Sequence, residues 1–582
     1  MKSFFKNVLA NIVAIFIILF IGFILMIGMI AVSAMGDSSS VKVKKNSVLT
    51  LNLKTNIIDS PADEKDDFFN FEDKQDYVVL YDAIKAINAA KTDDNIKGIS
   101  IEADYLSAGI TQLDDLREAI RDFKKSGKFV TTYGNNVNQG TYYLGSVADQ
   151  YYLHPAGGID LRGMSAEVMF FKEFAEKYGI GIEVIRHGKY KSAVEPYLRS
   201  DLSEENKEQL SVLINDIWNN VSGKIQQSRK MNATDYKLLV DSLYSVIPDN
   251  NLKFKTVDKL VQKSEYDDIL KNKLKIKKDD KLNKISLANY VKSMKEKTSS
   301  DKIGVLYASG EIFSGEGYDG IYSVNLIKEI KKLAKDKEIK AVVLRVNSPG
   351  GSANASDEIL FELQELKKKK PLVVSFGDYA ASGGYYIGMA GERIFSEPNT
   401  LTGSIGVFGM IPYFKQIANK NGIYADAVST NANSNEYSAV NGLSPGYKTI
   451  LTKSVEQTYK RFVHFVTLNR KKTFEQIDEV GGGRVWSGVR AKELGLVDQL
   501  GSLNDAIAYA SQKVKLKDYQ VVSYPKKVSM FEQIFSDMNP EEMEMKIIKR
   551  KIGEDKFQIF ETLTEPKLNN SVLMESPYRV TF

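Results

Sequence analysis

Cysteine is absent from this 582-residue sequence, so disulfide bonds and thiolate metal sites are excluded. Histidine is scarce: His154, His187 and His464 lie far apart along the chain and show no metal-ligand spacing. We therefore expect neither a metal nor another cofactor. The net charge of +5 is small for this length, which argues against a nucleic-acid partner.

The composition, with 43% hydrophobic and 26% charged residues, is typical of a folded protein, and the length indicates two or more domains. One long apolar run, residues 12–32, contains no charged side chain. As a helix it would span roughly 30 Å at ~1.5 Å per residue, enough to cross a bilayer core. Lys2 and Lys6 precede the run and Asp37 follows it, which predicts a cytoplasmic N-terminus and an extracytoplasmic main body. A cleaved signal peptide is the alternative, because residues 32–34 (VSA) resemble a cleavage site.

The segment FGDYAASGGYYIGMA (residues 376–390) follows the apolar residues 372–374, which we expect to form a short buried strand. A helix is expected to begin near Ser382, because the glycines after it keep the first turn open. A serine at such a strand-to-helix junction points into a cleft, and the next backbone N–H groups can stabilise an oxyanion. The alternative is that Ser382 only caps the helix.

Two long segments of the chain match each other without gaps at an offset of 243 residues, so we predict a duplicated fold. Each copy alternates apolar strands with periodic helices, which predicts α/β domains with mostly parallel strands. In the second copy we expect strands at 303–308, 341–346, 372–375 and 393–396, and helices at 325–334 and 355–367. The predicted organisation is a short cytoplasmic N-terminus (1–11), a transmembrane anchor (12–32), a first repeat domain (45–262), a lysine-rich charged helical linker (263–300), a second repeat domain (301–515) and a C-terminal tail (516–582).

The two copies differ where chemistry would be needed. The first copy has Gln139 opposite Ser382, and it lacks the Pro-Gly-Gly turn that the second copy carries within VNSPGGS (residues 346–352). Conversely, the first copy carries Lys191, and the offset places Ser434 opposite it. These reciprocal losses predict one composite site with parts from both copies. The glycine turn at 347–351 can bring a backbone N–H into that site, although an ordinary tight turn is the alternative.

A serine nucleophile needs a base. Histidine is the usual base, and His187 is the plausible histidine by location. Lys191 is a second candidate, since burial can lower a lysine pKa from ~10.4 by a few units. The repeat asymmetry favours Lys191.

Taken together, these residues resemble the signal peptide peptidase A (protease IV) family in its long, duplicated form. The resemblance covers about residues 48–515. It is carried by YKSAVEP at 190–196, ASGGYY at 381–386, TGSIGV at 402–407 and the segment 485–501.

The resemblance implies tandem crotonase-like (Clp protease-like) domains and a serine–lysine dyad. Ser382 would be the nucleophile, Lys191 the general base and Ser404 a hydrogen-bond partner of the lysine amine. The N–H groups of Gly351 and Gly383 would hold the oxyanion. It also implies a homotetramer on the bacterial inner membrane that degrades cleaved signal peptides and other extended apolar peptides. An acyl-CoA-binding crotonase-like enzyme and a non-catalytic membrane scaffold are the alternatives.

Overall fold

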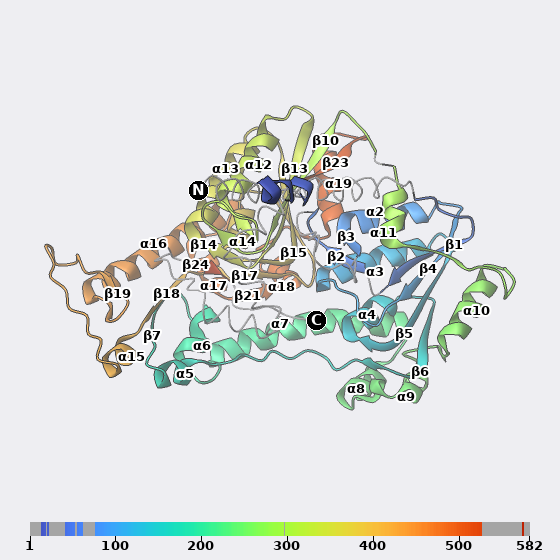
Figure 1. Ribbon diagram of the computed structural model, residues 1–582, viewed down its shortest axis with the longest axis horizontal. Helices are drawn as coiled ribbons and strands as arrows, with labels where there is room; N and C mark the ends of the chain where they lie inside the picture. The colour runs from blue at the N-terminus through green and yellow to red at the C-terminus, as the bar shows by residue number, and fades with distance from the viewer. Residues whose placement is uncertain are drawn as a thin grey trace, which may run out of the picture.

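The computed structural model of the protein describes residues 13–18, 20–22, 41–52, 55–61, 76–295, 297–526 and 573–575. Two α/β bodies lie side by side, one built mainly from residues before 300 and one from residues after it (Figure 1). Within these ranges no helix has both the length and the apolar character needed to cross a bilayer. Most of the apolar run 12–32, where we expected an anchor, lies outside the described residues.

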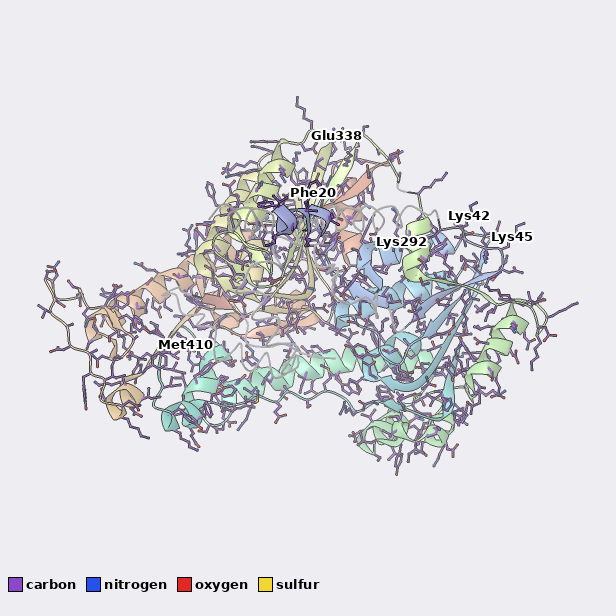
Figure 2. The ribbon with its side chains drawn as sticks, in the orientation of Figure 1. Phe20, Lys42, Lys45, Lys292, Glu338 and Met410 are labelled. Atoms are coloured by element: carbon purple, nitrogen blue, oxygen red, sulfur yellow. The ribbon has the colours of Figure 1, made fainter. Side chains whose placement is uncertain are left out.

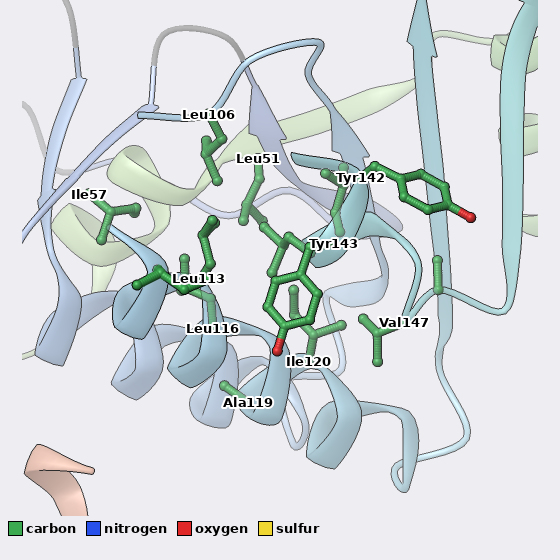
Figure 3. Packing of buried hydrophobic residues seen from close by; sticks show 14 of the residues in the cluster. Leu51, Ile57, Leu106, Leu113, Leu116, Ala119, Ile120, Tyr142, Tyr143 and Val147 are labelled. Atoms are coloured by element: carbon green, nitrogen blue, oxygen red, sulfur yellow. The ribbon is translucent and has the colours of Figure 1, made fainter. Parts of the chain in front are cut away.

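The first body is a parallel sheet with the strand order β8-β6-β5-β4-β1-β9, covered by helices. Its apolar residues recur at the spacing that places them on the buried face of each strand and helix. Figure 3 shows Leu113, Leu116 and Ile120 on one face of α3, packed with Tyr143 of α4 and Leu51 of β1. Its elements are β1 (Ser47–Asn52), α2 (Leu80–Ala90), β4 (Ile96–Glu102), α3 (Ile110–Lys124), β5 (Phe129–Asn138), α4 (Gln139–Gly145), β6 (Gln150–Asp160), α8 (Ala233–Asp241), α9 (Pro248–Lys253), β8 (Lys259–Leu260), α10 (Lys263–Lys273), β9 (Asn283–Ser286) and α11 (Leu287–Ser293), with a parallel pair β2 (Thr55–Ile58) and β3 (Asp76–Val79) beside them.

The second body repeats this arrangement, which confirms the predicted duplication. Its sheet has the order β21-β17-β15-β13-β10-β23, with β16 and β22 continuing from β15, and all of these pairs except β17–β21 are parallel. The strands and helices expected for this copy are all present. Its elements are β10 (Lys302–Ser309), α12 (Ser323–Lys335), β13 (Ile339–Ser348), α13 (Ala353–Lys367), β15 (Leu372–Ala381), α14 (Gly383–Gly388), β16 (Arg393–Ser396), β17 (Leu401–Gly403), α17 (Phe474–Val480), β21 (Val485–Ser487), α18 (Gly488–Glu493), β22 (Gln499–Leu500), α19 (Leu503–Lys513) and β23 (Gln520–Tyr524).

The segment 263–300 is more than the charged helical linker that we expected. Its first part is helical (α10), but β9 pairs in parallel with β1 at the edge of the first sheet, and α11 buries Leu287 and Tyr290 in the first core. In the second body β23 pairs with β10 in the same way. The start of the expected tail 516–582 therefore also belongs to a sheet, in which β23 is the edge strand as β9 is in the first body.

A third sheet joins the two copies, with the order β12-β11-β14-β24-β18-β7. Here β7 (Gly181–Arg186) of the first copy pairs antiparallel with β18 (Phe408–Tyr413) of the second. With α5 (Lys172–Lys177), α15 (Lys415–Lys420) and the pair β19 (Tyr437–Ser438) and β20 (Gly442–Leu443), these two strands form a wing at the left of Figure 1, where Met410 marks β18 in Figure 2. The remaining elements of this sheet are β11 (Ile312–Phe313), β12 (Ile321–Tyr322), β14 (Gly350–Ser352) and β24 (Leu573–Glu575).

Two long helices tie the wing to the bodies. The helix α7 (Glu204–Arg229) follows the short α6 (Glu195–Leu198) and runs beneath the molecule back to the first body (Figure 1). The helix α16 (Pro445–Arg470) packs on the second core, where the Phe462 ring meets Tyr386 of α14 edge-on at 4.9 Å. The pairing of β7 with β18 thus carries a segment of the first copy onto the second body.

Candidate active site

Ser382 lies where β15 ends and α14 begins, as the sequence predicted. Its backbone has φ +53° and ψ −115°, a conformation that L residues rarely adopt and that is often retained at functional sites. The Ser382 N–H donates to the Gly403 carbonyl at 2.8 Å, which holds the turn. The side chain makes no capping hydrogen bond to α14. The capping alternative therefore does not describe this serine.

The Lys191 amine reaches the Ser382 hydroxyl. Lys191 follows β7, is fully buried, and donates from Nζ to Ser382 Oγ at 2.9 Å. The same Nζ donates to Ser404 Oγ at 3.0 Å and to the Ser404 carbonyl at 3.3 Å. Ser382 and Ser404 are also fully buried. The structure thus brings together Ser382 and Lys191, which the comparison of the two copies assigned to one composite site, across 191 residues of chain. It also places Ser404 beside the lysine amine, as the family resemblance implied.

A glycine loop that sequence reasoning missed positions both sides of this site. Gly482 accepts a hydrogen bond at its carbonyl from the Tyr190 N–H at 3.1 Å, and the Ser404 N–H donates to the Arg484 carbonyl at 2.7 Å. Gly483 has φ +87°, and a Cβ there would lie 2.5 Å from the Lys191 backbone nitrogen. The run GGGR at residues 481–484 was a visible signal, since three consecutive glycines suggest a close backbone approach.

Neighbouring backbone surrounds the two expected oxyanion glycines. Gly351 has φ +149°, and a Cβ there would lie 2.2 Å from the Ile312 carbonyl oxygen of β11. A Cβ on Gly383 would lie 3.2 Å from the α-carbon of Gly350, and one on Gly350 would lie 2.7 Å from the Gly383 nitrogen. Side chains at these positions would therefore come closer to neighbouring atoms than ordinary contacts allow, which accounts for glycine at each of them.

The histidines are held by other partners. His187 Nδ1 pairs with Glu456 Oε1 at 2.7 Å, and its ring stacks on Tyr459 with 3.6 Å between ring centroids. His154 Nε2 bonds Gln262 Oε1 at 3.0 Å, and His464 meets the Phe465 ring edge-on. Among the residues that the structure describes, no group of three or more histidine, aspartate or glutamate side chains could hold a metal ion.

The two residues that the 243-residue offset pairs with Ser382 and Lys191 have other partners. Gln139, opposite Ser382, accepts at Oε1 from the Gly163 N–H at 2.9 Å and donates from Nε2 to the Gly163 carbonyl at 3.0 Å, which closes the equivalent turn. Ser434, opposite Lys191, lies exposed in the wing and accepts from the Asn431 N–H at 3.1 Å. At Gln139 the first copy thus keeps the turn of the site without its nucleophile.

A buried charge network behind β15 supports the strand that carries Ser382. Arg345 donates from Nη1 to the Phe376 carbonyl at 2.9 Å and pairs from Nε with Asp59 at 3.0 Å. Burial raises the pKa of Asp115 to about 7, and burial together with repulsion from Asp115 raises the pKa of Glu397 above its usual range. Because Asp59 and Asp115 come from the first copy, this network also holds the two bodies together.

Comparison with known proteins gives matches over most of the chain. The sequence matches peptidase family S49 over residues 122–277 and 364–517, once in each copy, and the Clp protease family over residues 294–402. It is 34% identical over 538 residues to Protease 4 of Salmonella typhi, covering 89% of this chain and 87% of that protein. It is 33% identical to Protease 4 of Haemophilus influenzae, covering 88% and 85% of the two chains. It is 32% identical to the chloroplastic serine protease SPPA of Arabidopsis thaliana, covering 82% and 70%.

Proposed function

Because the chain belongs to peptidase family S49 and is a serine peptidase, we propose that Ser382 is its nucleophile and Lys191 its general base. The observation that carries this assignment is the 2.9 Å hydrogen bond between the Lys191 amine and the Ser382 hydroxyl in a fully buried site. A lysine removed from water is held more easily as the neutral amine, which is the form that accepts a proton. The Ser404 hydroxyl, 3.0 Å from the amine, orients it towards Ser382.

The reaction follows from these positions. Lys191 takes the hydroxyl proton while Ser382 Oγ attacks the peptide carbonyl, and the backbone N–H groups of Gly351 and Gly383 stabilise the resulting oxyanion. Lys191 then gives the proton to the leaving amine, and water hydrolyses the ester on Ser382. The acyl-CoA enzyme and the scaffold, the alternatives from sequence, do not fit membership in a serine peptidase family.

Turnover of a fluorogenic leucine-containing peptide tests the dyad. We expect Ser382→Ala to abolish turnover and Lys191→Ala to lower kcat about 10²–10⁴-fold, the usual contribution of a general base. Lys189→Ala, two residues away with its amine over the Tyr190 ring, is the matched control and should retain activity. His187→Ala should also retain activity. Loss of activity in His187→Ala with full activity in Lys191→Ala would reject the lysine.

We further propose that residues 12–32 anchor the chain in the bacterial inner membrane with the site on the extracytoplasmic face, where it degrades cleaved signal peptides and other extended apolar peptides. The apolar run and the lysines before it support this proposal. Fractionation of cells with and without residues 1–40, followed by protease protection of spheroplasts, tests the anchor and its orientation. Recovery of the full chain in the soluble fraction would reject it.

The homotetramer that the family resemblance implies is likewise a proposal. Mass photometry of the detergent-solubilised full chain tests it directly. We expect a particle of four copies, and a monomer at micromolar concentration would reject the assembly.

A further inference from the structure

One glutamine of the long helix α7 bonds the chain on both sides of Lys191. Gln209 is a polar residue of the first copy, and it is only 1% exposed. Its Nε2 donates to the Tyr190 carbonyl at 3.1 Å and to Ser192 Oγ at 2.8 Å. These two residues flank Lys191 in the sequence. The Gln209 side chain therefore holds the lysine segment, residues 190–192, against α7.

The other end of the same amide holds the opposite side of the site. Gln209 Oε1 accepts from the Val485 N–H of β21 at 3.3 Å. Val485 lies opposite Gly403 where β21 pairs with β17, and the Gly403 carbonyl accepts from the Ser382 N–H at 2.8 Å. The residue after Gly403 is Ser404, whose hydroxyl contacts the lysine amine. One side chain thus links the lysine segment to a strand that leads through Gly403 to both serines.

Other residues of α7 reinforce this link. Glu208 pairs with Arg484 Nη2 at 2.8 Å, and the Arg484 guanidinium lies 4.7 Å from the centroid of the Tyr190 ring. Two turns further along α7, Asp216 accepts from Ser487 Oγ of β21 at 2.8 Å. The helix is therefore fixed to β21 along its length, with the lysine segment between them at Tyr190.

Gln209 is the buried member of this group and should have the larger effect. The Glu208 carboxylate is 52% exposed, and an ion pair at such a position contributes little. Removal of the Gln209 amide would instead take a partner from the Tyr190 carbonyl and from the Val485 N–H inside the protein. Buried polar groups that lose a partner are costly, so the segments would move to find new ones.

We propose that Gln209 is a positioning residue of the peptidase, which sets the distance between the Lys191 amine and the Ser382 hydroxyl. This proposal rests on the proposed function of those two residues. The amine lies 2.9 Å from Ser382 Oγ, and a shift of the lysine segment would lengthen this distance. A misplacement of about 1 Å in a reacting group costs about 10²-fold in rate. Gln209 acts through the two segments that it bonds and takes no part in the proton transfer.

Turnover of a fluorogenic leucine-containing peptide by the full chain in detergent tests this role. Gln209→Met keeps the length of the side chain and removes its amide, so we expect kcat to fall about 10–100-fold with KM unchanged. Gln209→Asn keeps the amide on a side chain one methylene shorter, which no longer spans both segments, and should show a similar fall. It decides the question if the methionine variant does not fold. Gln226→Met is the matched control, because Gln226 lies on the same helix and bonds the Ser222 carbonyl within it, and it should behave as the wild type.

Labelling with a serine-reactive fluorophosphonate separates positioning from stability. A displaced lysine should slow the labelling of Ser382 about 10–100-fold and leave every folded chain able to react, so that the final stoichiometry equals that of the wild type. A merely structural role of Gln209 would lower the final stoichiometry and leave the labelling rate of the remaining chains unchanged.

The outcomes separate this inference from the proposed function. A kcat within about threefold of the wild type in folded Gln209→Met and Gln209→Asn overturns the positioning role and leaves the dyad standing. An equal loss in Gln226→Met, or a lower stoichiometry at an unchanged labelling rate, also overturns it. A wild type that shows neither turnover nor labelling of Ser382 overturns the proposed function and this inference with it.

Discussion

The glycine loop against Lys191 gives the sharpest structural prediction. In Gly483→Ala, the new methyl group would lie 2.5 Å from the Lys191 nitrogen and 2.6 Å from its α-carbon. Ordinary contacts are nearly 1 Å longer, so the Lys191 backbone must shift by about that amount. A misplacement of about 1 Å in a catalytic group costs about 10²-fold in rate. We therefore expect kcat/KM for a fluorogenic peptide to fall about 100-fold.

A matched glycine separates displacement of the lysine from backbone strain. Gly422 has φ +77°, close to the +87° of Gly483, but a Cβ there would meet nothing within 4 Å. Both substitutions cost about 1–2 kcal/mol of stability because alanine disfavours positive φ. Thermal unfolding should thus show a loss in both variants, larger in Gly483→Ala because its methyl group also displaces Lys191, while turnover falls in Gly483→Ala alone. Turnover of folded Gly483→Ala within threefold of the wild type would refute the positioning role of this loop.

Three further predictions test other parts of the structure. Ser404→Ala removes one buried hydrogen bond to the Lys191 amine. Such a bond contributes about 1.4 kcal/mol, so kcat/KM in the peptide assay should fall about tenfold. Leu287→Ala should lower the free energy of unfolding by about 2–5 kcal/mol in a denaturant titration, because Leu287 is fully buried in the first core, whereas exposed Leu468→Ala should change it little. Burial raises the pKa of Asp115 to about 7, so the folded protein keeps a proton that the unfolded chain releases above ~3.9. That stabilisation is complete below ~3.9 and is lost as the pH rises through about 7. Asp115→Asn should reduce this fall in denaturant titrations between about pH 5 and pH 8, and an unchanged pH slope would contradict it.

Much of the fold could be predicted because its signals are local. The alternation of apolar strands and amphipathic helices predicted the parallel sheets, and the 243-residue register predicted that they occur twice. The site could be placed because the two copies differ at two positions, where Gln139 stands opposite Ser382 and Ser434 stands opposite Lys191. At each position one copy keeps a reactive group that the other copy lacks. Such a comparison within one chain does not depend on long-range contacts.

The missed features depend on contacts between distant segments. β9 is a four-residue strand in a lysine-rich segment, and its partner β1 lies more than 200 residues earlier. The antiparallel pairing of β7 with β18, which carries Lys191 to Ser382, has no local signal in either strand. β24 lies between β14 and β18, both of which are more than 150 residues before it in the sequence. Neither periodicity nor propensity reports these pairings.

Labelling of the nucleophile tests the central claim most directly. A serine-reactive fluorophosphonate probe would be reacted with the full chain, and the labelled peptide identified by mass spectrometry. The dyad predicts a single label on Ser382, none in Ser382→Ala, and labelling at least 100-fold slower in Lys191→Ala but unchanged in Lys189→Ala. A label on another serine, or labelling of Lys191→Ala at the wild-type rate, would contradict the account.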